Sequence, residues 1–88
     1  MELVEIDGVD GILSFDGRVL EYFQAGNRDA DWRVHVSHVI ETDIEQRKGM
    51  VMFQAYTTKR HYHGALVPDE RLAELEHLRA DVDARRRA

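Results

Sequence analysis

The apolar residues near the C-terminal end of the chain recur with the spacing of a helix. They lie three or four positions apart and therefore fall on one narrow stripe of a helical surface, while charged residues fill the positions between them. Pro68 suits the first turn of such a helix, where its missing N–H needs no partner. The pattern predicts an amphipathic helix over residues 68 to 84, followed by a frayed basic tail over residues 85 to 88. The stripe consists of Leu72, Leu75, Leu78 and Val82.

Upstream of this helix, apolar and polar residues alternate in short runs, which is typical of half-buried strands. Turn-forming residues separate the runs, and Asp16-Gly17 is a strong signal for a hairpin. Consecutive hairpins imply antiparallel pairing. A loop is predicted over residues 25 to 31, and residues 37 to 40 suit a corner or a single helical turn. The predicted strands cover residues 3–6, 11–15, 18–24, 32–36, 41–46, 50–57 and 61–67.

These elements together predict an α+β fold. We expect a strongly bent antiparallel sheet, or a partly open barrel, of six to seven strands capped by one C-terminal amphipathic helix. A sheet of this size leaves an apolar face open, and the leucine stripe of the helix is the part of the chain that covers it. The expected core consists of Leu13, Phe15, Phe23, Val34, Val36, Val51, Phe53, Leu66, Leu72, Leu75 and Val82.

Length and composition narrow the class of protein. Eighty-eight residues suit a single domain over residues 1–88. The formal net charge of −5 argues against a general nucleic-acid binder, because such proteins need a positive field. The chain has no cysteine, which excludes disulfides and Cys-type zinc sites, and its first residues lack the pattern of a signal peptide. We expect a soluble, cytoplasmic protein.

The predicted order of elements, four strands, a corner, three strands and a C-terminal helix, resembles the pleckstrin-homology-like plan. The local sequence is similar to short bacterial domains of this kind, particularly actinobacterial ones. The resemblance implies a scaffold for interactions. The first hairpin, which carries several basic residues in phosphoinositide-binding members, offers only Arg18 here. The residues that carry the resemblance are Gly11-Ile12-Leu13-Ser14-Phe15-Asp16-Gly17-Arg18-Val19, Trp32-Arg33-Val34-His35-Val36-Ser37-His38-Val39, Met50-Val51-Met52-Phe53 and Arg71-Leu72-Ala73-Glu74-Leu75.

The first functional hypothesis is a non-enzymatic binding module for a protein or peptide partner, or for self-association. An open sheet edge beside residues 36 to 41 is a place where another strand can add. Large aromatic side chains with a polar tip are typical of binding surfaces, and Tyr22 and Tyr62 are the candidates. Trp32 is expected in the core, because it alternates with Val34 and Val36.

A second hypothesis is the recognition of an anionic ligand or a membrane surface. Two predicted turns are basic, one with Arg47 and Lys48 and the other with Lys59 and Arg60. If both turns lie at one end of the sheet, four positive charges gather there. The acidic balance of the chain makes a membrane surface the less favoured partner.

The third hypothesis is a small metal-dependent enzyme. His61 and His63 are two residues apart on a predicted strand, and His35 lies on another, so the three can offer nitrogen ligands to zinc. No strong ligand spacing such as H-E-x-x-H supports this reading, and Ser37-His38 lacks the context of a nucleophile and its base. We therefore expect no metal, no cofactor and no catalytic residues.

Overall fold

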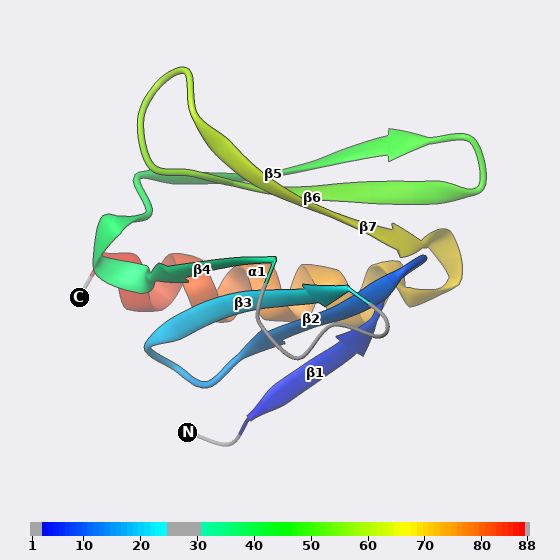
Figure 1. Cartoon of the computed structure of the whole chain (residues 1–88), viewed down its shortest axis with the longest axis horizontal. Helices are drawn as coiled ribbons and strands as arrows, with labels where there is room; N and C mark the ends of the chain where they lie inside the picture. The colour runs from blue at the N-terminus through cyan, green and yellow to red at the C-terminus, as the bar shows by residue number, and fades with distance from the viewer. Residues whose placement is uncertain (1–2, 25–30, 88) are drawn as a thin grey trace.

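The computed structural model describes residues 3–24 and 31–87, and within these ranges the chain forms two antiparallel sheets and one long helix (Figure 1). The first sheet has the order β1-β2-β3-β4 and the second the order β5-β6-β7. The predicted α+β class is confirmed, but the sheets are separate and do not close into a barrel. Residues 25–30 of the loop predicted over residues 25–31 lie outside the described residues. The strands are β1 (Val4–Asp7), β2 (Gly11–Phe15), β3 (Val19–Gln24), β4 (Trp32–His35), β5 (Glu41–Arg47), β6 (Met50–Tyr56) and β7 (Tyr62–Pro68).

Short local signals set the connections between the strands. The chain reverses between β2 and β3 at Gly17, whose φ of 98° is a conformation that glycine adopts without strain. The Asp16 side chain accepts hydrogen bonds from the N–H groups of Arg18 and Val19, which fixes this turn. The first sheet leads into the second through a 3₁₀ turn, η1 (Val36–His38), at the predicted corner.

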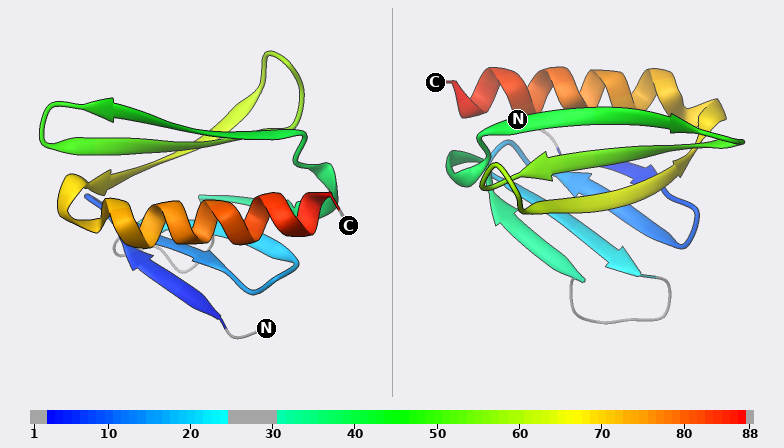
Figure 2. Two further views of the ribbon diagram at one scale, coloured as in Figure 1. Left: turned by 180° about the vertical axis from the view of Figure 1, so that it is seen from behind. Right: turned by 90° about the horizontal axis from the view of Figure 1, so that it is seen from above.

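The helix α1 (Leu72–Arg86) lies across one side of the molecule and contacts both sheets (Figure 2). It begins later than predicted, because Pro68 ends β7 and a second 3₁₀ turn, η2 (Asp69–Arg71), precedes it. Proline is tolerated at this strand end because β7 is an edge strand. The helix also extends beyond residue 84 into the expected tail, since Arg86 is held by hydrogen bonds to Asp83 and to the backbone of Ile40.

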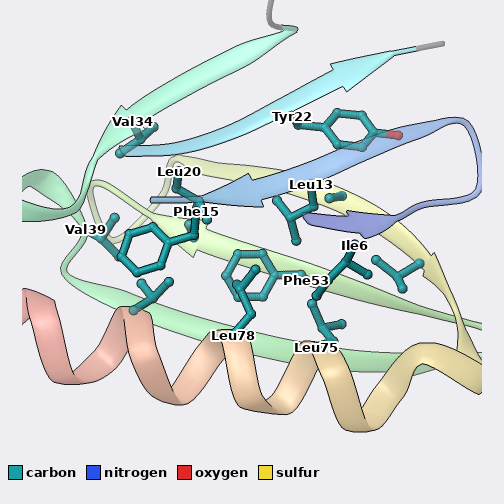
Figure 3. Packing of buried hydrophobic residues seen from close by; sticks show 14 of the residues in the cluster. Ile6, Leu13, Phe15, Leu20, Tyr22, Val34, Val39, Phe53, Leu75 and Leu78 are labelled. Carbon is teal, nitrogen blue, oxygen red and sulfur yellow. The ribbon is translucent and has the colours of Figure 1, made fainter. Parts of the chain in front are cut away.

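The core lies between the two sheets and the helix (Figure 3). Most predicted core residues are buried, and Leu75, Leu78 and Val82 of the helix are fully inaccessible. Two strands bury a different face from the one expected. In β3 the buried residues are Leu20 and Tyr22 in place of Phe23, and in β7 they are Ala65 and Val67 in place of Leu66. Leu72 packs only partly buried at the start of the helix.

Trp32 links the two sheets, whose described strands do not pair with each other. Its ring packs partly buried against the core, and its indole Nε1–H donates to the carbonyl oxygen of Gly64 in β7 at 2.9 Å. Nearby, the N–H of Val9 donates to the carbonyl oxygen of Leu66 at 2.9 Å. These two bonds occupy carbonyl groups along the outer edge of β7, so this edge is partly covered by the first sheet.

Candidate functional site

Tyr22, predicted to be an interaction residue, belongs to the core. Its side chain is only 4% exposed and its hydroxyl donates to the Asp10 carboxylate. Burial and this hydrogen bond both raise the pKa of Tyr22. The backbone of Gly8 and Gly11 passes beside its ring, so the turn between β1 and β2 covers it. The structure therefore places Tyr22 in the core, and a role for it in binding a partner stays a prediction.

Tyr62 lies at the surface, with 48% of its area exposed. Its ring centroid is 5.5 Å from that of Tyr56 on the neighbouring strand. The pair forms a small aromatic surface at the end of the second sheet. A role for Tyr62 in binding a partner stays a prediction.

The two basic turns do not gather at one end of the sheet. Arg47 and Lys48 precede β6, whereas Lys59 and Arg60 follow it, so the seven residues of β6 separate the two pairs. Figure 1 shows the β5–β6 turn and the β6–β7 connection at opposite ends of the second sheet. Arg47 also pairs with Glu45 at 3.4 Å. The hypothesis of an anionic ligand required both turns to form one site with four positive charges, and the structure does not form such a site.

The histidines named as metal ligands are also dispersed. His63 packs against Trp32, with ring centroids 5.3 Å apart, and His35 lies nearer to His38, at 6.2 Å between centroids. His61 precedes β7 in the exposed connection. Within residues 3–24 and 31–87, no three side chains of the types that bind metals converge.

Arg79 and Arg86 of the helix have structural partners that the sequence did not suggest. They join Thr42 of β5 and Asp83 of the helix in one polar network. Arg79 donates from Nε to Thr42 Oγ1 at 3.1 Å and from Nη2 to the Thr42 carbonyl oxygen at 3.0 Å. Thr42 Oγ1 donates to Asp83 at 2.7 Å, and Arg86 Nε donates to the same carboxylate oxygen at 2.8 Å. This network fastens the C-terminal half of the helix to β5.

Replacing the buried Thr42 by valine is expected to destabilise the domain by about 1–2 kcal/mol at neutral pH, because two hydrogen bonds are lost. Burial tends to raise the pKa of Asp83, but hydrogen bonds from Arg86 and Thr42 outweigh it and lower that pKa below its usual value. A carboxyl group whose pKa is lower in the folded than in the unfolded protein stabilises the fold. This contribution is fully present at a pH above the pKa of the unfolded chain, and it is lost as the pH falls below about 4.

The cost of Thr42→Val should therefore shrink between pH 7 and pH 3, which urea unfolding at the two pH values measures. Thr57→Val, the same change outside the network, is the control and should show no such pH dependence. An equal cost for Thr42→Val at both pH values would contradict the role of Asp83.

The outer edge of β5 offers unpaired backbone groups beside the helix. Residues of an antiparallel edge strand alternate between those that bond to the neighbouring strand and those that face outward. The Thr42 carbonyl accepts a hydrogen bond from Arg79 and therefore points away from β6. The backbone groups of Ile44 and Gln46, two and four residues further along β5, point the same way. For these two residues, no backbone bond outside the sheet ladder is formed within the described parts of the chain.

A groove of about 510 Å³ runs along this edge, between β5 and α1. Its apolar lining comes from Ile44, Leu72 and Ala80, and polar side chains of the helix form its rim. The opposite face of β5 is acidic and exposed, with Glu41, Asp43 and Glu45 on alternate positions. The edge therefore presents hydrogen-bonding groups, an apolar groove on one face and negative charge on the other. We call residues 44–46 and this groove the β5 edge site.

Comparison with known proteins gives no match to a family model, to a curated protein or to a solved structure. Within the described ranges, none of the helices has the length and apolar character needed to cross a membrane. The candidate function consequently depends on the geometry of this chain alone.

Proposed function

We propose that the chain is a non-enzymatic, pleckstrin-homology-like binding module that takes an extended segment of a partner protein as an additional strand on β5. The order of four strands, a corner, three strands and a helix supports the pleckstrin-homology-like assignment. The observation that carries the binding function is the β5 edge site. Strand addition uses backbone groups for affinity and alternate side chains for specificity, and this site offers both.

The helix limits how far a segment can pair along β5. Arg79 and Arg86 occupy the carbonyl groups of Thr42 and Ile40, so the first part of the edge is already capped. Ile44 and Gln46 remain available to an added strand. Such a short interface favours weak, reversible recognition, because each hydrogen bond contributes about 0.5–1.5 kcal/mol.

The two faces of β5 specify the chemistry of the partner segment. Side chains of an added strand that point toward the helix would enter the apolar groove beside Ile44 and Leu72. Those on the other face would lie beside Asp43 and Glu45, the acidic residues that flank the uncapped part of the strand, where opposite charges across neighbouring strands stabilise pairing. The partner segment is thus an extended sequence in which apolar and basic residues alternate.

A peptide of alternating valine and lysine is expected to bind, whereas its valine and glutamate counterpart is not. Gln46→Pro should weaken binding by roughly tenfold or more, because proline removes an outward N–H that strand addition requires. The outward N–H is not used by the β5–β6 ladder, so the fold tolerates this change. Titration calorimetry measures the affinities, and slower hydrogen exchange at Ile44 and Gln46 on binding locates the peptide.

Glu5→Pro is the matched control, because Glu5 lies at an exposed position on β1, the outer strand of the other sheet. It should leave peptide affinity unchanged. Gln46→Pro keeps the net charge, so its effect separates strand addition from attraction between a basic peptide and an acidic protein. Equal binding by Gln46→Pro and the unaltered protein would contradict the proposal.

A further inference from the structure

A second, larger groove opens on another side of the molecule, away from the β5 edge site. It has a volume of about 910 Å³ and lies between β4, the 3₁₀ turn η1 and the β6–β7 connection. Figures 1 and 2 show these segments on the same side of the structure. Ligand sites for small molecules commonly have volumes of about 300–1,000 Å³, so the size fits a small ligand. We call it the β4–η1 groove.

The lining of the β4–η1 groove differs in charge from the rest of the chain. Although the protein carries a formal charge of −5, none of the residues that line this groove is acidic. The lining includes one arginine and three histidines, from three different elements. The arginine, Arg33, pairs with Glu21 outside the lining at 3.4 Å, and 67% of the Arg33 side chain remains exposed. The four residues are Arg33, His35, His38 and His63.

Two local structures orient hydrogen-bond donors at this groove. The Ser37 N–H donates to His35 Nδ1 at 3.1 Å, so Nδ1 acts as an acceptor and the ring proton lies on Nε2. Thr58 Oγ1 accepts from the N–H groups of Arg60 and His61, which leaves its hydroxyl proton to donate elsewhere. Ser37 and Thr57 also belong to the lining, and the Ser37 hydroxyl, 2.9 Å from His35 Nδ1, donates its proton to that ring nitrogen. His35 Nε2–H and the Thr58 hydroxyl are the donors that these local bonds leave unused.

We propose that the β4–η1 groove binds a phosphoryl group. Arg33 pairs with Glu21 through Nε, which leaves its two terminal nitrogens free of that bond. These nitrogens, with N–H and O–H donors in a lining that has no carboxylate, favour an anion with several acceptor oxygens. A cation would find no carboxylate in the lining, and the histidines do not converge as metal ligands within the described ranges. Lys59 and Arg60 lie beside this groove on the β6–β7 connection, so one of the two basic turns adds positive charge near it.

Titration with inorganic phosphate and with pyrophosphate, followed by amide chemical shifts, tests this site. Saturable shifts confined to residues 33–38 and 57–63 are expected. Arg33→Glu should weaken binding by roughly tenfold or more, since it removes a charge-assisted contact and adds repulsion. Arg47→Glu is a matched control, because Arg47 is also exposed and pairs with a glutamate at 3.4 Å. It should change the affinity by less than about twofold.

Equal losses in Arg33→Glu and Arg47→Glu, or shifts at both basic turns without saturation, would overturn the proposal. Vesicles that contain a phosphoinositide distinguish the source of the phosphoryl group. If the vesicles bind the protein and Arg33→Glu abolishes this binding, the site is supported and its ligand is a lipid headgroup. If the protein binds phosphate but not the vesicles, the site is supported and its ligand is soluble. Binding of neither overturns it. Gln46→Pro should retain phosphate binding. The proposals for this groove and for the β5 edge site can therefore be contradicted independently of each other.

Discussion

Leu75→Asp is expected to leave the chain unfolded at neutral pH. Leu75 has no accessible surface and packs between the helix and both sheets (Figure 3). Loss of a buried leucine side chain costs about 2–5 kcal/mol, and an unpaired buried carboxylate adds several more. The sum is comparable with the whole stability of a small domain, about 5–15 kcal/mol. Circular dichroism and the dispersion of amide resonances measure the outcome.

Ala73→Asp provides the control, because Ala73 is exposed on the same helix two residues earlier. An acid there lies near the positive end of the helix dipole, so the fold should be retained within about 0.5 kcal/mol. A folded Leu75→Asp protein of unchanged stability would show that the leucine stripe is not part of the core and is free to bind a partner.

Gly11→Ala is expected to destabilise the domain by about 3 kcal/mol, near the upper end of the usual cost of overpacking. A Cβ at Gly11 would lie 2.1 Å from the backbone oxygen of Phe23 and 2.9 Å from the Tyr22 ring. The first of these atoms belongs to the neighbouring strand of the ladder, so relief requires movement of the backbone itself. Urea unfolding compares the variant with the unaltered protein.

Gly64→Ala adds the same methyl group to another strand. Its nearest contact would be the Met52 sulfur at 2.9 Å, the end of a flexible side chain that can move. The change in stability should stay below about 1 kcal/mol. If the two variants are equally destabilised, the loss arises from glycine replacement in general and not from the close approach at Gly11.

The helix and most of the core were predictable because local and long-range demands agree there. Leu75 and Val82 have only one face of a helix on which to lie, and that face is apolar throughout. Val51 and Phe53 likewise alternate with residues that are less buried. In the helix the sequence pattern admits one arrangement, whereas β6 also carries Met50 and Met52 on its less buried face.

The errors in β3 and β7 arise where both faces of a strand carry apolar residues. In β3, Phe23 and Val19 alternate with Leu20 and Tyr22, so periodicity alone cannot choose the buried face. The choice is made by tertiary contacts, including the turn between β1 and β2 that covers the Tyr22 ring. Leu66 was predicted in the core, yet Ala65 and Val67 face it.

The candidate sites differ in how far the sequence pointed to them. The separation of the two basic turns was readable, because a strand of seven residues has its two flanking turns at opposite ends. By contrast, no local pattern indicates that Arg79 and Arg86 cap the start of β5, since 37 and 46 positions separate the partners. The β4–η1 groove likewise brings together Arg33, His38 and His63 only through the packing of the two sheets.

The helix follows all of the described strands in the sequence, and this order has a consequence for synthesis on the ribosome. A nascent chain that has emerged as far as Pro68 has all seven of the strands described here, but nothing yet covers the face that Leu75, Leu78 and Val82 will close. Exposed apolar surface and uncapped strand edges are the features that chaperones bind and that promote aggregation. The domain must therefore complete its folding after residues 72–86 have left the exit tunnel, and a pause in translation before them would prolong the vulnerable state.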